Sequence, residues 1–433
     1  MKVNARKVVL ETLNEIDNNK FTNKLIQEIQ KREDIESRDM GFISKIVYGV
    51  VENRMYLDYV VRKFSSIRLK KIEPEILNIL RMSAYQIIYL TKVPNSAVVD
   101  EAVKLTKKVN KRHSGFVNGI LRNMIRNLET VELPKADNER LSIQYSHPLW
   151  MVDRWLAVYG LSFTEDLLKA NNETPHLVLR TNTLLINRED LMTKLKSSGL
   201  ECKKSDIVEE GIIITSLGSL SIDQIPEFGL GYFTIQDESS MMVSRILDPK
   251  AGEYILDLCA APGGKTTHIS QLMENKGQVY ACDITEKKLD LVKENIKRLK
   301  LNNIRLFEND ATVFNESFVD KFDKVLVDAP CSGLGIIRRK PDIKYQKTEA
   351  DILALNDIQM TILDQASKYI KQGGVLVYST CTIEPSENRL MVEAFLKSHT
   401  DFEILPINED KDLQLYPNVD ETDGFYCCKL LRK

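Results

Sequence analysis

The feature that most restricts the fold is a regular alternation of apolar runs and helical stretches in the second half of the chain. From about residue 235 onward, apolar runs of strand length recur at 254–260, 278–284, 304–310, 323–330 and 374–381. Helical stretches fill the gaps between them. Apolar strands that alternate with helices are typical of a parallel sheet that is covered on both faces. Residues 235–433 are therefore predicted to form a doubly wound α/β domain.

Residues 1–130 show a different pattern, in which apolar residues recur at helical spacing. This part of the chain holds only four glycines and two prolines. One helix face is formed by Phe42, Ile43, Ile46, Val47 and Val50. Such spacing over 130 residues predicts an all-helical domain.

The region 131–234 has a mixed pattern and is predicted to be a small α+β connecting domain. The segments 176–182 and 211–216 are typical of strands, and 188–199 is typical of a helix that ends at a glycine. The sequence thus predicts three domains, over 1–130, 131–234 and 235–433.

Charge is distributed unevenly along the chain, although the net charge is only −2. Residues 1–130 hold 24 Lys and Arg against 15 Asp and Glu, a balance of +9, so the remaining residues carry −11. A basic first third on an acidic chain suggests a module that binds a polyanion such as RNA. A lysine-rich solvated helical surface would give the same balance, so charge alone leaves both interpretations open.

Several classes of protein are not favoured by the sequence. No run of 18 apolar residues suggests a membrane span, and the first residues do not resemble a signal peptide. The seven cysteines are an odd number without a C-x-x-C pair, and the five histidines are scattered. Neither a disulfide framework nor a metal site is expected, and a cytoplasmic protein with free thiols is.

Carboxylates follow four of the predicted strands. They are Asp257, Asp283, Asp310 and Asp328. In a doubly wound sheet, ligands bind beyond the carboxyl ends of the strands, and an acid after the second strand is where ribose hydroxyls are held. A cap at the start of a helix explains a single such aspartate, but four at one sheet edge favour a nucleoside-binding site. Asp310 is then suited to accept a hydrogen bond from an adenine amino group.

Small residues form the turn after the first strand. They run Cys259, Ala260, Ala261, Pro262, Gly263 and Gly264, with Lys265 next. Such a loop lets backbone approach a ligand closely, and the following helix offers free N–H groups. A phosphate-binding P-loop would need a glycine at position 259, where Cys259 stands. We therefore expect an adenosine-containing cofactor and no phosphate cleavage.

Two cysteines follow neighbouring strands, Cys331 after the fourth and Cys381 after the fifth. A lone strand cysteine is usually core filler, but two at one ligand-binding edge favour chemistry. A thiolate that adds to carbon 6 of cytosine makes carbon 5 nucleophilic enough to take a methyl group from a sulfonium. A second group must then remove the proton from carbon 5, and a nearby acid such as Asp328 can hold the edge of the base.

Three long motifs resemble those of the RsmB/NOP2/NSUN family of RNA cytosine-C5 methyltransferases. They are DLCAAPGGKT (257–266), DAPCSGLG (328–335) and STCTIEPSEN (379–388). Segments 95–108 and 115–123 resemble a NusB-like helical RNA-binding domain, and segments of the middle region resemble the family's connecting domain. The resemblance covers nearly the whole chain and points to the family's bacterial members that act on small-subunit ribosomal RNA.

The resemblance implies a Rossmann-like class I methyltransferase domain and a role for each motif residue. The loop 259–265 would bind S-adenosylmethionine, with its ribose on Asp283 and its adenine on Asp310, and Asp328 would lie between cofactor and base. Cys381 would be the nucleophile and Cys331 the releasing residue. Lys265 would also touch the target nucleotide. The basic residues Arg338, Arg339 and Lys340 would face RNA.

The implied partner is 16S ribosomal RNA, bound by a monomer. Two other functions are alternatives to RNA cytosine methylation. A DNA cytosine-C5 methyltransferase would use the cysteine of the Pro-Cys pair as its nucleophile, and Cys381 after Ser379-Thr380 argues against this. An RNA-binding factor with an inactive sheet domain would not need both cysteines and the small-residue loop.

Overall fold

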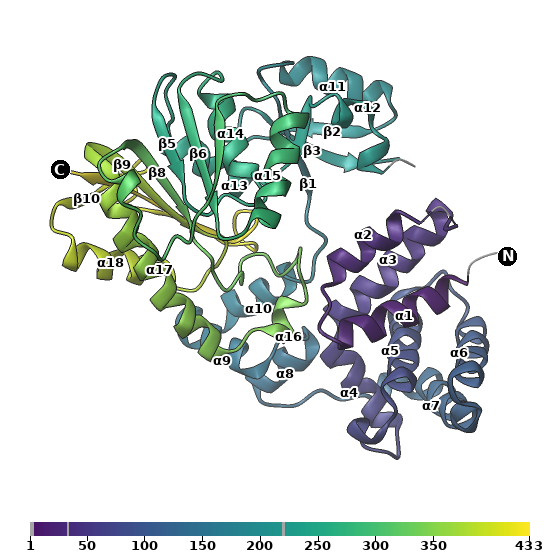
Figure 1. Cartoon of the computed structure of the whole chain (residues 1–433). Coiled ribbons are helices and arrows are strands. Elements are labelled where there is room, and N and C mark those ends of the chain that lie inside the picture. Colours follow the sequence, from purple (N-terminus) through teal and green to yellow (C-terminus); the bar gives the residue numbers. More distant parts are fainter. Residues whose placement is uncertain (1–3, 33, 219–220) are drawn as a thin grey trace. The chain divides into compact units, whose positions relative to one another are not determined.

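The computed structural model describes residues 4–32, 34–218 and 221–433, which form two compact units (Figure 1). The first unit comprises Met1–Glu173 with Ile337–Gln346, and the second comprises Thr174–Ile336 with Lys347–Lys433. Residues 1–3, 33 and 219–220, which belong to the predicted first two domains, lie outside the described residues. The predicted division into three domains stays a prediction, because compactness does not show which parts fold independently.

The first unit is helical, as the periodicity over 1–130 predicts. Its helices are α1 (Ala5–Asp17), α2 (Thr22–Gln30), α3 (Ser37–Glu52), α4 (Arg54–Phe64), α5 (Pro74–Tyr89), α6 (Asn95–Asn110), α7 (Ser114–Asn127), α8 (Asp137–Gln144), α9 (Leu149–Tyr159), α10 (Leu161–Ala170) and α16 (Ile343–Gln346). Helix α5 is central because it is apolar on most sides and packs against α1, α3, α4, α6 and α7. At one close approach, a side chain at Gly49 of α3 would collide with the ring of Tyr85 of α5.

The segment 337–346 is built into the helical unit although it follows the Cys331 loop in sequence. Asp342 accepts hydrogen bonds from the backbone N–H (3.3 Å) and hydroxyl (2.6 Å) of Thr22 at the start of α2. Lys344 is fully buried and donates to the carbonyl oxygen of Glu52, and Tyr345 donates to that of Val51. The end of α3 and the start of α2 thus depend on residues that are remote in sequence.

The second unit contains a small antiparallel sheet in the order β2-β3-β1-β4. Its strands are β1 (Leu177–Thr181), β2 (Glu201–Lys204), β3 (Gly211–Ser216) and β4 (Phe233–Ile235), with helices α11 (Arg188–Ser197) and α12 (Pro226–Gly229). The predictions of strands over 176–182 and 211–216 and of a helix over 188–199 are confirmed.

The larger sheet of this unit has the order β10-β12-β9-β8-β5-β6-β7. Its strands are β5 (Tyr254–Asp257), β6 (Gln278–Asp283), β7 (Ile304–Glu308), β8 (Phe322–Asp328), β9 (Ile370–Thr380), β10 (Phe402–Leu405) and β12 (Phe425–Arg432), and β11 (Leu413–Leu415) pairs with β12. All five predicted strands occur as β5 to β9, and they pair in parallel. The strand order reverses between β8 and β5, where a doubly wound sheet binds its ligand.

Helices cover both faces of this sheet, as Figure 1 shows. On one face lie α13 (Glu238–Leu247), α14 (Gly264–Leu272) and α15 (Glu286–Arg298); on the other lie α17 (Glu349–Tyr369) and α18 (Arg389–Ser398). Side chains alternate accordingly: on β5, Ile255 belongs to the core under α13 and α14, and Leu256 belongs to the core under α17. The predicted Rossmann-like α/β fold is confirmed.

The expectation of a purely parallel sheet is wrong at the end of the chain. Strand β12 runs antiparallel between β9 and β10, with Tyr426 opposite Thr380 and Leu431 opposite Val375. The segment 425–432 is buried on both sides for most of its length, so it lacks the alternation that marks an antiparallel strand with one solvated face. The sheet is therefore mixed, with a parallel centre that carries the predicted site.

Candidate active site

The four predicted carboxylates all follow strands of the parallel centre, at the same edge of the sheet. Asp257, Asp283 and Asp328 are the last residues of β5, β6 and β8, and Asp310 comes two residues after β7. Because β8, β5, β6 and β7 are consecutive neighbours in the sheet, their carboxyl ends form one continuous rim. The sequence-predicted cluster is thus brought together by the strand order.

The loop 259–265 runs from this rim into helix α14. Its backbone is fixed by hydrogen bonds from Ala260 N–H to the carbonyl of Cys282 (2.8 Å) and from Ala261 N–H to the carboxylate of Asp283 (3.0 Å). Gly263, with φ of +101°, turns the chain into the helix, and no side chain caps the helix start. The first N–H groups of a helix have no partner within the helix. The loop therefore directs uncapped backbone donors along the rim.

Asp283 and Asp310 differ in how strongly the protein already holds them. Asp283 is buried and accepts hydrogen bonds from the N–H groups of Ala261 and Ile284 (2.8 Å) and from Lys288 (3.0 Å). Asp310 is exposed, and hydrogen bonds from the hydroxyl and N–H of Thr312 lower its pKa. Asp283 thus shapes the loop as well as the rim, whereas Asp310 presents an ionised carboxylate to solvent.

Asp257 is the most deeply buried of the four carboxylates. One of its oxygens accepts a hydrogen bond from the hydroxyl of Thr266 (2.6 Å), and the other, Oδ1, has no partner among the described residues. Burial raises the pKa of Asp257 to about 7, although the bond from Thr266 opposes the rise. The end of β5 therefore keeps a carboxyl group that is only marginally ionised at neutral pH.

Asp328 and Lys265 form an ion pair with a Nζ–Oδ2 distance of 2.7 Å. The second oxygen of Asp328 accepts a hydrogen bond from Ser379 at the end of β9 (2.9 Å). Burial alone would lower the pKa of Lys265, but the negative charges of Asp328 and Cys381 raise it. The lysine therefore stays protonated and favours negative charge on both groups.

The sulfur atoms of Cys331 and Cys381 lie 3.3 Å apart, although the residues are 50 positions apart in sequence. The hydrogen bond with Cys381 and burial raise the pKa of Cys331 well above that of a free thiol. Cys331 therefore keeps its proton and can donate it toward the sulfur of Cys381. The two predicted residues form one thiol pair, and all seven cysteines of the chain are free.

The two cysteine loops are held by residues that sequence reasoning did not single out. The buried carboxylate of Glu387 accepts from the N–H (2.9 Å) and hydroxyl (2.6 Å) of Ser332, next to Cys331. The N–H of Gly335 donates to the carbonyl of Cys381 (3.1 Å), and a side chain at Gly335 would collide with the backbone of Gly424. Glu387 lies within the recognised third motif, so its motif membership was the available signal.

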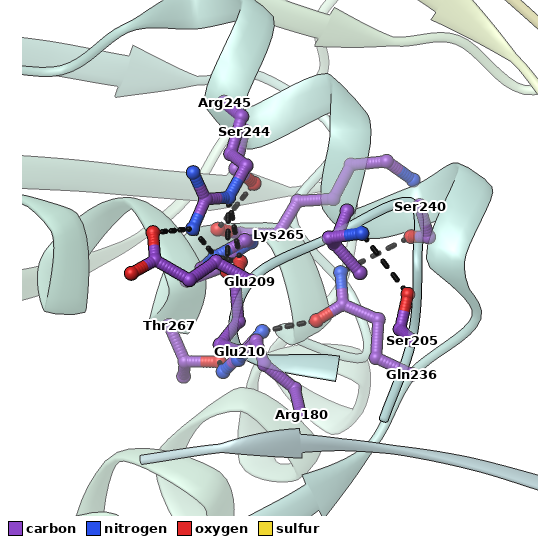
Figure 2. A network of polar contacts seen from close by, with 12 residues as sticks. Arg180, Ser205, Glu209, Glu210, Gln236, Ser240, Ser244, Arg245, Lys265 and Thr267 are labelled. Atoms are coloured by element: carbon purple, nitrogen blue, oxygen red, sulfur yellow. Dashed lines mark hydrogen bonds and ion pairs between the residues drawn. The ribbon is translucent and has the colours of Figure 1, made fainter. Parts of the chain in front are cut away.

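A second missed residue is Arg180 on β1 of the small sheet. It is fully buried and donates to the carbonyl of Gly264 (2.5 Å), the hydroxyl of Thr267 (2.8 Å) and the side chain of Gln236, as Figure 2 shows for Gln236 and Thr267. In the same network, Glu210 contacts His268 (2.5 Å) and Arg245. Through these hydrogen bonds, the small sheet holds the first turn of α14 in place, directly behind the loop 259–265.

The predicted RNA-facing residues Arg338, Arg339 and Lys340 belong to the segment built into the helical unit. Arg338 is buried, Arg339 is half-buried and Lys340 is exposed. Only the last of the three therefore presents its charge fully to solvent, and Arg338 is held within the protein.

The rim residues fit the predicted cofactor. A side chain at Gly264 would make ordinary van der Waals contact with Gln236, at 3.7 Å, and would collide with no atom at the start of α14. Uncapped N–H groups at the start of α14 and the exposed carboxylate of Asp310 supply donors and an acceptor at this rim. Negative charge at the rim also suits a sulfonium cation. In the described part of the chain, no cluster of side chains could hold a metal ion, and no helix could cross a membrane.

Comparison with known proteins supports this assignment along the whole chain. Residues 244–431 match the family model "16S rRNA methyltransferase RsmB/F", residues 3–126 match "NusB family", and residues 147–221 match the RsmF/B-like ferredoxin-like domain. The chain is 37% identical to the "Probable ribosomal RNA small subunit methyltransferase B" of Bacillus subtilis, over 100% of this chain and 99% of the relative.

Solved structures agree with the family models. The chain in the "Crystal Structure of PH0851" is 26% identical with a TM-score of 0.85, over 100% of this chain and 99% of that one. The Pyrococcus horikoshii NSun6 structure "with SFG" is 27% identical with a TM-score of 0.59, over 65% of this chain and 97% of that one. The predicted cofactor, S-adenosylmethionine, and the predicted methyl transfer are confirmed. The chain belongs to the RsmB/F family of 16S rRNA methyltransferases.

Proposed function

We propose that the protein methylates carbon 5 of a cytosine in small-subunit ribosomal RNA, with Cys381 as the covalent nucleophile. The observation that carries the proposal is the thiol pair of Cys331 and Cys381, 3.3 Å apart and beside the ion pair of Lys265 and Asp328. Methylation of a ring carbon needs a nucleophile and a separate proton acceptor, whereas methylation of a nitrogen or a ribose oxygen needs neither thiol.

The cofactor residues have the roles that the family resemblance implies. S-adenosylmethionine supplies an electrophilic methyl group on its sulfonium. The loop 259–265 would contact it with backbone N–H groups, Asp283 would accept from the ribose hydroxyls and Asp310 from the adenine amino group. Asp328 would lie toward the target base and hold its N3 and N4 edge, and Lys265 would hold the carboxylate of Asp328 in place through their ion pair.

Cys381 is the better nucleophile of the two cysteines. Its sulfur can accept a hydrogen bond from the thiol of Cys331, and its negative charge is stabilised by Lys265. Both interactions favour the thiolate form, which is the reactive one. The thiolate adds to carbon 6, electrons move to carbon 5, and carbon 5 takes the methyl group.

Cys331 acts after that bond has formed. Its pKa is raised chiefly by the hydrogen bond with Cys381 and by burial, and the charge of Cys381 adds to the rise. When Cys381 is bonded to carbon 6, its charge is gone and it no longer raises the pKa of Cys331, so that only the effect of burial and of the nearby carboxylates remains. The thiol of Cys331 can then lose its proton to water and take the proton of carbon 5. Carbon 5 and carbon 6 regain their double bond, and Cys381 leaves as a thiolate.

The test is to trap the adduct. Cys381→Ala should abolish methyl transfer and give no covalent complex, because nothing adds to carbon 6. Cys331→Ala should accumulate protein bound to labelled substrate RNA, because the proton of carbon 5 is lost too slowly. Denaturing gels would show a slow band for Cys331→Ala alone. Cys202→Ala, a half-buried cysteine of the small sheet, is the control and should behave like the wild type.

Three outcomes would contradict the proposal or a part of it. A trapped band for Cys381→Ala and none for Cys331→Ala would exchange the two roles, as in DNA cytosine-C5 methyltransferases. Full methyl transfer by Cys381→Ala would remove covalent catalysis altogether. Bisulfite mapping of ribosomal RNA from cells that lack the protein would identify the cytosine, and its absence from small-subunit RNA would contradict the substrate.

A further inference from the structure

We propose that Cys381 is a site of oxidation by hydrogen peroxide, and that Cys331 converts the oxidised sulfur into a reversible disulfide that stops methyl transfer. The sulfur atoms of the two residues are 3.3 Å apart, and both side chains are only half-buried, so a small oxidant can reach them. The inference rests on the proposed function in one respect, which is that methyl transfer needs both thiols.

The two sulfurs can form a bond with little movement of the chain. A disulfide has a sulfur–sulfur distance of about 2.05 Å, so the pair must close by roughly 1.3 Å. Asp328 lies opposite Ser379 in the paired strands β8 and β9, and Cys331 and Cys381 follow these residues closely in sequence. The N–H of Gly335 also donates to the carbonyl of Cys381 (3.1 Å), which holds the two loops together. Rotation of the two side chains can therefore close the bond while the strands stay paired.

The neighbours of Cys381 make it the first sulfur to react. The ammonium group of Lys265 and the thiol of Cys331 both favour its thiolate, which is the form that attacks peroxide. Cys331 differs, because the hydrogen bond with Cys381 and burial raise its pKa and keep its proton in place. Burial also raises the pKa of the five other cysteines, which are Cys202, Cys259, Cys282, Cys427 and Cys428. Oxidation should therefore begin at Cys381.

The reaction consumes one molecule of peroxide and releases two of water. The thiolate of Cys381 attacks one oxygen of hydrogen peroxide, so that a sulfur–oxygen bond forms, the oxygen–oxygen bond breaks, and the departing hydroxide takes up a proton. The thiol of Cys331 then loses its proton and attacks the sulfur of this sulfenic acid. A sulfur–sulfur bond forms, the sulfur–oxygen bond breaks, and the second hydroxide leaves with that proton as water. The two thiols lose two electrons, and these electrons reduce the peroxide.

Cys331 would thereby protect Cys381 from permanent loss. A sulfenic acid that no thiol captures is oxidised further to sulfinic acid, which thiols do not reduce. A disulfide returns to two thiols by exchange with a reduced dithiol. While the disulfide exists, neither sulfur can add to carbon 6 or accept the proton of carbon 5. The loop 259–265 takes no part in the bond, so the oxidised protein should still bind S-adenosylmethionine.

The first test follows the bond and the activity together. The wild-type full chain, treated with a small excess of hydrogen peroxide, should give a peptide pair joined through Cys331 and Cys381 after alkylation and digestion. Methyl transfer to small-subunit ribosomal RNA should fall at least about tenfold and return with dithiothreitol. The affinity for S-adenosylmethionine, measured by titration calorimetry, should be unchanged. If both thiols are still alkylated after peroxide, or if dithiothreitol does not restore the activity, the proposal is wrong.

The second test separates the two sulfurs by mass spectrometry, which does not depend on activity. In Cys331→Ala, dimedone, a reagent for sulfenic acids, should label Cys381, and longer exposure to peroxide should give sulfinic acid. In the wild type, this labelling should be at least about tenfold lower, because Cys331 removes the sulfenic acid. In Cys381→Ala, Cys331 should stay a thiol at the same dose of peroxide. Cys202→Ala is the matched control and should form the disulfide like the wild type. Equal oxidation of Cys331 with and without Cys381 would contradict the proposed order.

The failure of this inference differs from the failure of the proposed function. If the wild type forms 5-methylcytosine in ribosomal RNA and peroxide neither joins the two cysteines nor lowers the rate, only the oxidation site is refuted. If peptide mapping finds the disulfide but the reduced wild type forms no 5-methylcytosine in any ribosomal RNA, the proposed function fails. The pair then remains an oxidation site without the proposed control of methyl transfer.

Discussion

At the scale of single residues, Asp257 makes the stability of the protein depend on pH. Its pKa rises from 3.8 in the unfolded chain to about 7 in the folded protein. Between these values the folded state holds a proton that the unfolded state has lost, so stability falls as the pH rises. Asp257→Asn keeps an acceptor for Thr266 and removes the ionisation. The variant should gain stability relative to the wild type from about pH 4 to about pH 8, by roughly 4 kcal/mol at most.

Urea unfolding across that pH range measures the difference. Asp310→Asn is the control, because the pKa of Asp310 is lowered and its contribution is lost only on further acidification. The control should therefore show a constant difference from the wild type above about pH 5. A constant difference for Asp257→Asn would mean that the buried carboxyl is ionised throughout.

Individual site residues could be predicted where they directly follow a strand that the sequence pattern identifies. Cys331 and Cys381 were placed at neighbouring strand ends, and the structure brings their sulfurs within contact distance. Their catalytic roles stay predictions. Arg180 was missed because its partner Gly264 is 84 positions away and no local pattern marks it. Glu387 lies within the third motif, but its partner Ser332 is 55 positions away, so its structural role could not be seen from the sequence. A buried polar residue reveals its purpose only when its partner is known.

At the scale of elements, Arg180 of strand β1 fixes the first turn of helix α14, directly behind the loop 259–265. Arg180→Met removes the donors to Gly264 and Thr267 while it keeps much of the side-chain volume. Unpaired buried acceptors then favour a looser start of α14. The affinity for S-adenosylmethionine, measured by titration calorimetry, should fall by about tenfold or more, since each lost charged hydrogen bond contributes about 1.5–3 kcal/mol.

Arg298→Met provides the comparison. Arg298 also joins the small sheet to a helix of the larger one, donating to the carbonyl of Phe233 (2.7 Å) and the hydroxyl of Thr234 (3.0 Å). It stands in the last turn of α15 and reaches the loop 259–265 only indirectly, through Asn295, whose side-chain amide donates to the carbonyl of Pro262 (3.0 Å). This variant should lose stability but keep its cofactor affinity. If both variants lose affinity equally, Arg180 has no special effect on the loop.

Helices and strands whose apolar residues follow a single clear pattern could be predicted, and those without such a pattern could not. The parallel strands β5 to β9 are apolar runs between helices, and they were found with their order along the chain. Strand β12 was missed because its burial pattern has no period of two. Its position between β9 and β10 depends on tertiary packing, which propensity does not encode.

At the scale of the whole molecule, residues 337–346 belong to the helical unit but lie in sequence between two stretches of the second unit. Asp342→Ala should therefore destabilise the helical unit, because Thr22 loses the acceptor for its hydroxyl and N–H. The expected loss is roughly 1–3 kcal/mol. Trp150 and Trp155 are the two tryptophans of the chain and both belong to the helical unit, so their fluorescence follows its unfolding.

Asp351→Ala is the matched control for this variant. Asp351 pairs with Thr348 in the capping box of α17, nine positions further along the chain but in the other unit. Its loss should leave the tryptophan transition unchanged. Equal shifts for both variants would show that the units unfold together. The sequence did not predict the discontinuous unit, since the resemblance implied only that the basic residues Arg338, Arg339 and Lys340 face RNA.

The placement of 337–346 also orders events during synthesis of the chain. The ribosome makes residues 174–336, which belong to the second unit, before it makes the last segment of the first. Until then, the carbonyls of Val51 and Glu52 lack the partners that Tyr345 and Lys344 provide. A nascent chain that stops before residue 347 therefore carries an incomplete helical unit. Such truncated products should be preferred targets of proteases and chaperones, even though their first 173 residues are intact.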